Sequence, residues 1–348
     1  MTVLKSPFPW FGGKSRVASI VWSRFGNTKN YVEPFAGSLA VLLRRPKDHQ
    51  YGEDLYNIWP TETVNDKDGF ISNLWRAIQA DPDKVIHYAD WPVSEVDLHA
   101  RHSWLNARRE KLTRKLEGDP AFYSSKVAGW WLWGISCWIG SGWCSGKGGW
   151  VVHNGELVQR PESDTSPGVF KQRPKLGKLK DVSTGFDLPP LTSWLQRLSE
   201  RLRRVRVCSG DWSRVLSRSA TTVLGTTGVF LDPPYDKKIR TDVYSTDSVG
   251  LSGKVREWAL EQGDDPKLRI ALCGYDGEHV MPDTWEEVAW RGGGYASQGK
   301  NTQGQKNQHR ERIWFSPHCL KPEPKAPKTE GLKSPWERAD QKNTRKTK

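Results

Sequence analysis

Asp232-Pro233-Pro234-Tyr235 places an acid, two prolines and an aromatic ring directly after the apolar segment Val229-Phe230-Leu231. The prolines remove two backbone donors and fix the turn. An amino group bound there can donate one hydrogen bond to the Asp232 carboxylate and another to the Pro233 carbonyl, while Tyr235 stacks on a flat ring. This chemistry suits the exocyclic amine of a base extruded from a nucleic acid helix. The simpler alternative is an ordinary surface turn.

Acidic residues and a glycine-bearing turn lie where other predicted strands end. Tyr31-Val32-Glu33 runs into the tight turn Glu33-Pro34-Phe35-Ala36-Gly37-Ser38, in which Gly37 permits close approach of a ligand to the backbone. Asp66 and Asp211 each follow a further predicted strand. Ligands of an open parallel sheet bind outside the carboxyl ends of its strands, so we expect these ends to face one crevice together with Asp232.

Each of these strand ends also has a purely structural interpretation. The turn at residues 33–38 lacks the Gly-Lys-Ser/Thr ending of a phosphate loop, and it could be an ordinary turn. Asp66 lies where dinucleotide sites place an acid that binds ribose hydroxyls. Alternatively, Asp66 caps the helix that follows it. A helix cap is equally the alternative for Asp211.

The elements that must position these residues alternate between strand and helix. We predict strands at 31–33, 63–66, 205–208, 229–231, 269–273 and 312–315, and helices at 39–43, 70–80, 191–203 and 254–262. Repeated strand–turn–helix units favour an α/β fold with a parallel sheet.

The segment between these two α/β stretches has a different composition. Residues 99–116 and 127–139 have helical patterns, residues 140–149 are dense in glycine, and residues 150–190 are rich in Pro, Gly, Lys and Ser. We therefore predict a domain of residues 1–80 and 191–320, with a mainly helical insertion at 81–190. The Lys- and Pro-rich residues 321–348 are predicted to be a basic disordered tail.

Composition narrows the class of partner. The 348 residues carry a net charge of +13, and residues 1–320 remain basic without the tail, so a polyanion such as nucleic acid is expected. The lack of an apolar run long enough to span a bilayer argues against a membrane protein. We also expect no secretion, because the N-terminus has no apolar signal core. The five cysteines show no CxxC pair, which argues against zinc and fits free thiols in the cytoplasm.

The predicted insertion has many basic residues and a tryptophan cluster. The basic residues are Arg101, Arg108, Arg109, Lys111, Arg114, Lys115, Lys126, Lys147, Arg160, Lys171, Arg173, Lys175, Lys178 and Lys180. They suit phosphate contact, although residues 101–115 could equally form a solvated helix face. Trp130, Trp131, Trp133, Trp138 and Trp143 are expected to form core in preference to a base-stacking platform.

Three motifs in one order resemble the Dam-type adenine DNA methyltransferases. They are Trp10-Phe11-Gly12-Gly13-Lys14, Val32-Glu33-Pro34-Phe35-Ala36-Gly37-Ser38 and Asp232-Pro233-Pro234-Tyr235. The resemblance covers residues 7–80 and 191–316, and the insertion matches only loosely. It implies a Rossmann-like, S-adenosylmethionine-dependent methyltransferase sheet with an inserted target-recognition domain, in an enzyme from a bacterium or a phage.

The resemblance also implies roles for individual residues. The cofactor-binding residues would be Trp10, Lys14, Glu33, Pro34, Phe35, Gly37, Ser38, Asp66, Asp211 and Asp232, and the catalytic residues Asp232, Pro233, Pro234 and Tyr235. Trp10 and Lys14 would contact the cofactor from the N-terminal loop. The turn would underlie its methionine part, Asp66 would bind the ribose, and Asp211 would approach the cofactor adenine.

The expected partner is double-stranded DNA, and the expected target is a flipped-out adenine. S-adenosylmethionine would be the methyl donor, and no metal is expected. We expect a monomer or weak dimer. Other enzymes with a similar turn methylate cytosine N4, RNA or protein glutamine. Asp rather than Ser or Asn at position 232 favours adenine. A second alternative is an inactive DNA-binding relative. Ile139–Cys144 departs from the family's helix and Asn/Arg-bearing loop, so no recognition sequence is predicted.

Overall fold

The computed structural model describes residues 4–10, 13–49, 59–138, 143–144, 150–153, 156–159, 191–235, 250–292 and 309–322. Its central element is a seven-stranded sheet. In spatial order the strands are β5 (Val205–Ser209), β2 (Thr61–Asp66), β1 (Asn30–Glu33), β6 (Thr227–Leu231), β7 (Leu268–Tyr275), β9 (Glu311–Phe315) and β8 (Glu286–Ala289). A separate antiparallel pair joins β3 (Trp150–His153) to β4 (Glu156–Gln159).

The sheet is mostly parallel. β5, β2, β1, β6 and β7 run in the same direction, and β9 pairs antiparallel with both β7 and β8. The strand order reverses between β1 and β6, which makes the carboxyl ends of these two strands the topological switch point. The protein therefore has a mixed α/β fold compatible with the Rossmann-like sheet that the sequence predicts.

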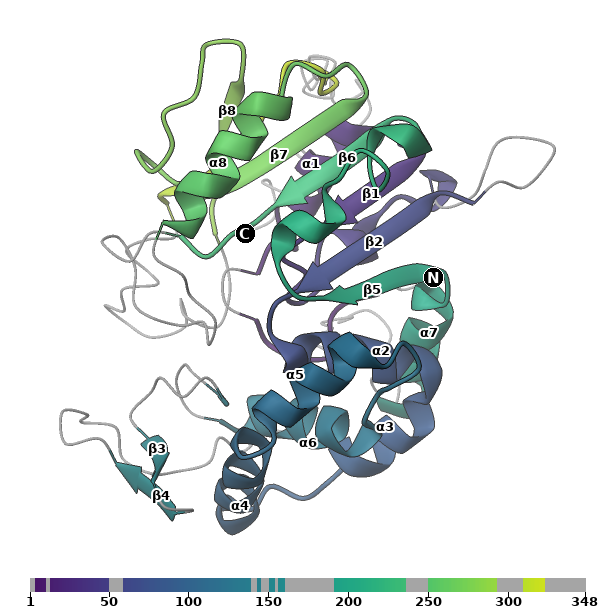
Figure 1. Ribbon diagram of the computed structural model, residues 1–348, viewed down its shortest axis with the longest axis vertical. Helices are drawn as coiled ribbons and strands as arrows, with labels where there is room; N and C mark the ends of the chain where they lie inside the picture. The colour runs from purple at the N-terminus through teal and green to yellow at the C-terminus, as the bar shows by residue number, and fades with distance from the viewer. Residues whose placement is uncertain are drawn as a thin grey trace, which may run out of the picture.

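Eight α-helices are described. They are α1 (Ala18–Phe25), α2 (Gly69–Ala80), α3 (Pro82–Ala89), α4 (Glu95–Asn106), α5 (Arg109–Gly118), α6 (Ser125–Cys137), α7 (Leu191–Leu202) and α8 (Leu251–Gln262). Four short 3-10 helices are η1 (Leu42–Arg44), η2 (Lys47–His49), η3 (Trp212–Val215) and η4 (Thr222–Leu224). Figure 1 shows α2–α7 gathered beyond the β5 edge of the sheet and α8 in front of β7. Within the described residues, no helix is both long and apolar enough to cross a membrane.

Local sequence explains where several elements begin and which surface they bury. Asp68 caps α2 by accepting the Phe70 N–H, and Ser124 caps α6 by accepting the Val127 N–H. β6 is buried at every position, as expected of a central parallel strand covered on both faces. Its alternating side chains therefore serve two separate cores.

Two hydrophobic clusters lie on opposite faces of the sheet. Phe230 belongs to the first cluster, whereas Val229 and Leu231 belong to the second, because successive strand residues point to opposite faces. The first cluster continues through Trp75 and Trp194 into the helices α3–α6. The helical region thus shares one continuous hydrophobic core with one face of the sheet.

Two sequence-based helix predictions are wrong. Only the 3-10 helix η1 forms in the region predicted as a helix over 39–43, because Leu39 has a left-handed φ of 54° that interrupts helical geometry. The predicted helix at 99–116 is two helices, α4 and α5, separated at Ala107–Arg108. α4 packs against α6 while α5 packs against α2, so the chain changes direction between two packing partners.

Candidate functional site

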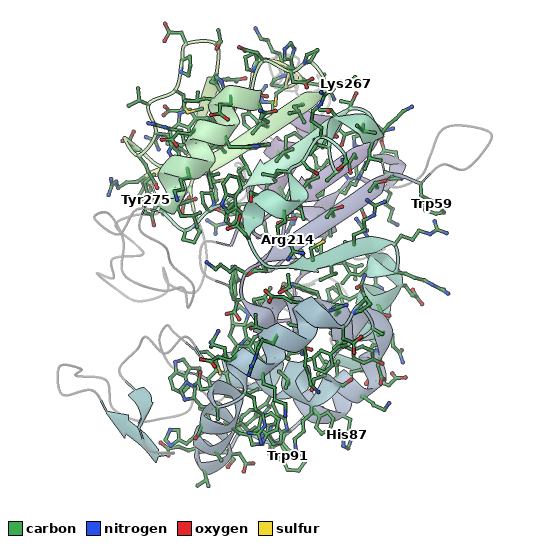
Figure 2. The ribbon with its side chains drawn as sticks, in the orientation of Figure 1. Trp59, His87, Trp91, Arg214, Lys267 and Tyr275 are labelled. Carbon is green, nitrogen blue, oxygen red and sulfur yellow. The ribbon has the colours of Figure 1, made fainter. Side chains whose placement is uncertain are left out.

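The carboxyl ends of the neighbouring strands β2, β1 and β6 form the edge of the sheet that carries the candidate site. In Figure 1 the arrowheads of these strands point to the same side. Figure 2 marks β7, the next strand, by Lys267 near its start and Tyr275 at its carboxyl end. Glu33 is the last residue of β1, Asp66 is the last residue of β2, and Asp232 directly follows β6. Burial raises the pKa of Glu33 most, and the negative charges of Asp232 and Asp66 raise it further, which places the three acids near one another. The predicted convergence of these acids is therefore observed.

Lys14 reaches the Asp232–Tyr235 turn from the N-terminal loop. Its Nζ lies 3.0 Å from Asp232 Oδ1 and donates a hydrogen bond of 2.6 Å to the Tyr235 hydroxyl. The Lys14 side chain is 7% exposed, whereas that of Asp232 is 24% exposed. The Asp232 side chain therefore remains partly exposed, whereas its lysine partner is buried.

Glu311 at the start of β9 completes this cluster, and sequence reasoning missed it. Its Oε2 accepts a hydrogen bond of 3.0 Å from the Tyr235 hydroxyl and lies 3.5 Å from Lys14 Nζ. The only sequence signal is an acid at the head of an otherwise largely apolar strand, which is also common at exposed strand ends. Since β9 is antiparallel to β7, its first residue lies at the carboxyl edge of the parallel strands.

Burial dominates the electrostatics of the cluster. It raises the pKa of Asp232, and the Lys14 ammonium opposes that rise. Burial also raises the pKa of Glu311, again against the effect of Lys14. The pKa of Tyr235 lies well above its ordinary value, first through burial and then through the two neighbouring carboxylates. Tyr235 is accordingly a neutral hydroxyl that both accepts and donates hydrogen bonds.

The ring of Tyr235 is covered in this structure. Tyr235 is 7% exposed, Lys14 Nζ lies 4.9 Å from its ring centroid, and Tyr275 packs edge-on at 4.7 Å. Trp290 lies on another side of Lys14, with its ring centroid 5.4 Å from Nζ. The predicted stacking of Tyr235 on a bound base requires a rearrangement of these contacts and stays a prediction.

The predicted cofactor turn is held by two hydrogen bonds at Gly37. Its N–H donates to Asp66 Oδ2 at 2.9 Å, and its carbonyl accepts from Trp75 Nε1 at 2.9 Å. Gly37 has a φ of 44°, and a Cβ at this position would lie 2.5 Å from Trp10 Nε1. Only glycine fits this backbone and this approach. The structure thus brings Gly37 and Asp66 together, as the sequence predicts, and places Trp10 against Gly37.

Asp66 and Glu33 are acids held in a low-dielectric environment. Asp66 Oδ1 accepts the Asp68 N–H at 2.8 Å, and burial raises the pKa of Asp66 to about 7. Burial raises the pKa of Glu33 to about 8, against a hydrogen bond of 2.9 Å from the Tyr31 hydroxyl. The alternative in which Asp66 caps the next helix is wrong, because Asp68 performs that role.

Asp211 is a helix cap. It caps η3 by accepting the Ser213 N–H at 3.0 Å and the Ser213 hydroxyl at 2.6 Å, which also lowers the pKa of Asp211. This confirms the alternative interpretation of Asp211 as a helix cap. The predicted contact of Asp211 with a cofactor stays a prediction. The adjacent Trp212 stacks on Phe35 with ring centroids 6.2 Å apart, which brings the β1 turn and the end of β5 together.

The remaining turn residues and two unsatisfied polar atoms lie close by. The Pro34 carbonyl accepts from Asn65 Nδ2 at 3.1 Å, and Ser38 is buried. Asn65 Oδ1 and Ser209 Oγ are buried without a hydrogen-bond partner among the described residues. Buried polar atoms without partners at the carboxyl ends of β2 and β5 are atoms that a polar ligand would satisfy.

A cavity of about 520 Å³ lies between α5 and the carboxyl ends of β2 and β5. Lys67, Arg109 and Arg114 line it, and so do Glu110, Glu117 and Asp211, so cations and acids are equal in number in its lining. Arg109 also forms an ion pair of 3.4 Å with Asp68, so Asp68 partly neutralises the charge of Arg109. α5 is thus the basic helix that borders the candidate site.

The structure separates the predicted basic residues into buried and exposed groups. Arg101 is buried, with its guanidinium 4.3 Å from the centroid of Trp133 and close to two other tryptophans, so the predicted phosphate contact by Arg101 is wrong. Arg108, Lys111, Arg114 and Lys115 are exposed, and Arg109 and Lys126 are half-buried. Lys147, Arg160, Lys171, Arg173, Lys175, Lys178 and Lys180 lie outside the described residues.

The tryptophans of α6 and its surroundings form core. Trp131, Trp133, Trp138 and Trp143 are all buried, and Trp130 is half-buried. The interpretation of this cluster as core is therefore confirmed for the four buried rings.

No protein-family model matches the chain, and comparison with curated proteins finds no relative. The function must consequently be argued from the site itself.

Proposed function

We propose that this chain transfers a methyl group from S-adenosylmethionine to the exocyclic amino group of a flipped-out adenine in double-stranded DNA. The observation that carries the proposal is the environment of Asp232. Its Oδ1 lies 3.0 Å from Lys14 Nζ and 3.3 Å from the Tyr235 hydroxyl, and no hydrogen bond from the described part of the chain reaches its Oδ2. An acceptor oxygen beside the Pro233 carbonyl suits an amino group with two N–H donors.

The surroundings fit a polar, nucleoside-containing cofactor. Asn65 Oδ1 and Ser209 Oγ offer unsatisfied polar atoms, and the half-buried Phe35 and Trp212 offer aromatic faces for a flat ring. Trp10, Lys14, the turn at 33–38 and Asp66 would hold the remainder of the cofactor, as the resemblance implies. When bound, S-adenosylmethionine supplies a methyl group activated by its sulfonium charge.

The protein's own groups would prepare the amine for attack. The adenine amine is a weak nucleophile because its lone pair is delocalised into the ring. Hydrogen bonds to Asp232 Oδ2 and to the Pro233 carbonyl would localise that lone pair and orient the nitrogen. Lys14 holds the other carboxylate oxygen, so Asp232 does not have to reorganise during the reaction.

DNA as the carrier of the amine is supported by charge and position. The chain has a net charge of +13, and the exposed cations of α5 border the same edge of the sheet as Asp232. A protein or a small metabolite as substrate does not explain this charge. Cytosine N4 has the same two N–H donors, so the test must identify the base.

The proposal is tested by incubating purified protein with tritium-labelled S-adenosylmethionine and double-stranded DNA, followed by separation of the methylated bases. We expect label in N6-methyladenine. Asp232→Ala should reduce transfer by about a thousandfold or more while DNA binding persists, because the amine loses its acceptor.

Asp81→Ala is the matched control for loss of an acid, because Asp81 caps α3, away from every residue assigned to the site. It should retain far more activity than Asp232→Ala. Transfer by Asp232→Ala at the wild-type rate would refute the mechanism. Label in N4-methylcytosine would show that the enzyme methylates cytosine and not adenine. Single-molecule sequencing of DNA from cells that express the protein would then give the target sequence.

A further inference from the structure

Glu311 is a buried acid that the proposed mechanism does not yet use. It is 6% exposed at the start of β9, where its Cα pairs with that of Tyr275 on β7. The sheet, and not the catalytic turn, therefore determines its position. Its carboxylate nevertheless points into the cluster of Lys14, Asp232 and Tyr235.

The Lys14 ammonium contacts all three other members of the cluster. Its Nζ lies 3.0 Å from Asp232 Oδ1, 2.6 Å from the Tyr235 hydroxyl and 3.5 Å from Glu311 Oε2. The Tyr235 hydroxyl has one proton, and its acceptors are Glu311 Oε2 at 3.0 Å and Asp232 Oδ1 at 3.3 Å. The shorter contact favours donation to Glu311. Glu311 therefore accepts the hydrogen bond of the Tyr235 hydroxyl and shares the Lys14 ammonium with Asp232.

The charge balance of this cluster depends on Glu311. With Asp232 alone, a buried lysine at 3.0 Å would neutralise the acid and weaken it as a hydrogen-bond acceptor. With Glu311 ionised, one ammonium faces two carboxylates, and the cluster has an excess negative charge. Asp232 is the more exposed of the two acids, at 24% against 7% for the Glu311 side chain. The carboxylate of this pair that is more accessible to a substrate is therefore Asp232.

We infer that Glu311 is a positioning residue that offsets Lys14 and so keeps Asp232 a strong acceptor for the amino group of the substrate. This inference rests on the proposed function for its substrate. Its physical content, the coupling between Glu311 and Asp232, can be measured without any activity. Glu311 itself would touch neither the amine nor the methyl donor.

The effect of Glu311 on Asp232 has a definite sign. The groups whose charges act on Asp232 are Lys14, Tyr235, Glu278, Glu33, Cys273 and Glu311. Removing a negative neighbour stabilises the ionised form of Asp232. Glu311→Gln should therefore lower the pKa of Asp232, and the acid limb of the pH–kcat profile should move to lower pH. The plateau of kcat should nevertheless fall, because Asp232 is then neutralised by Lys14 alone.

The first measurement follows the Asp232 carboxyl by 13C NMR in cofactor-free protein labelled at aspartate, with Asp232→Asn to assign the signal. We expect the pKa of Asp232 to fall by about one unit in Glu311→Gln. The second measurement is steady-state methyl transfer. We expect kcat to fall about tenfold or more, with KM for DNA changed less than about twofold.

Two further variants separate this role from a structural one. Glu311→Asp keeps the charge and should restore the pKa of Asp232 and most of kcat. Glu287→Gln on the neighbouring strand removes an acid that accepts from Arg312 Nε at 3.0 Å, outside the cluster. It should alter neither quantity. Thermal unfolding of each variant verifies that it is folded.

The outcomes distinguish the inference from the proposed function. An unchanged pKa of Asp232 in folded Glu311→Gln overturns the inference, as does loss of kcat with no shift of the acid limb. A wild-type protein that transfers no methyl group overturns the proposed function. In that case a lowered pKa of Asp232 still supports the coupling between Glu311 and Asp232.

Discussion

At the scale of the residue, the site combines groups that proteins seldom bury together. Lys14, Asp232, Tyr235 and Glu311 are contributed by the N-terminal loop, the turn after β6 and the strand β9. Each group is satisfied only while the others are present, because burial penalises every unpaired charge. The cluster therefore ties three distant segments of the chain to one point.

This mutual dependence predicts a large cost for losing the single cation of the cluster. Lys14→Met leaves Asp232 and Glu311 buried without their shared partner. We expect the free energy of unfolding to fall by about 3 kcal/mol and methyl transfer to be lost. Urea denaturation at neutral pH measures the first effect, and the labelled-methyl assay measures the second.

Lys84 provides the matched control. It pairs with Asp81 at 2.9 Å on the surface, and its side chain is 72% exposed. Lys84→Met should change the free energy of unfolding by less than about 1 kcal/mol, because exposed ion pairs contribute little. Equal destabilisation by the two substitutions would contradict the cooperative role that we assign to Lys14.

At the scale of the element, strand ends and helix α5 define the crevice. The turn after β1 is held against β2 by the Gly37–Asp66 hydrogen bond, and η3 places Trp212 beside Phe35. α5 borders this region with its basic residues. The break between α4 and α5 allows α5 to pack on α2, next to the sheet, while α4 packs on α6.

The position of α5 predicts that its exposed cations contact DNA phosphates. Replacing Lys111 and Arg114 together by Gln should weaken DNA binding and reduce the slope of log K against log salt concentration by about 2, because two phosphate contacts are lost. Fluorescence anisotropy over a range of salt concentrations measures both quantities.

The charge-matched control is the double substitution of Arg203 and Arg206 by Gln. These residues are exposed at the β5 edge of the sheet, and the substitution removes the same net charge. It should leave the salt dependence nearly unchanged. If both double variants reduce the slope equally, binding follows net charge and α5 has no special role.

At the scale of the whole molecule, the buried acids couple folding to pH. Glu33 has a pKa of about 8 and Asp66 of about 7, against ordinary values of 4.5 and 3.8. The folded state therefore binds more protons than the unfolded state between the ordinary and the raised values. The stability that these neutral acids contribute is present at low pH and is lost as pH rises through 7 to 8.

The free energy of unfolding should accordingly contain a component that falls by on the order of 2 kcal/mol between pH 6 and pH 8 because of Glu33. Glu33→Gln, which resembles the neutral acid, should remove most of this component. Urea denaturation of both proteins across this pH range measures the difference. Parallel pH dependences of the two proteins would show that Glu33 is not the titrating group.

Much of the α/β framework could be predicted because its signals are local. The apolar run before Asp232 and the turn at 33–38 place strands and their ends in order, since strand and helix periodicities are read over a few residues. The same reasoning failed for residues 39–43, where apolar composition suggested a helix. The left-handed Leu39 and the turn geometry overrode that local preference.

The sequence by itself determined which residues end the central strands and therefore which acids meet at one edge, because parallel strands share a direction. Only the tertiary structure decided how those acids are charged and partnered. Glu311 joins Asp232 across 79 positions of sequence because β9 runs antiparallel beside β7. Arg101 became a core residue because three tryptophans surround it. Burial and long-range pairing are properties of the packed chain, and no local pattern encodes them.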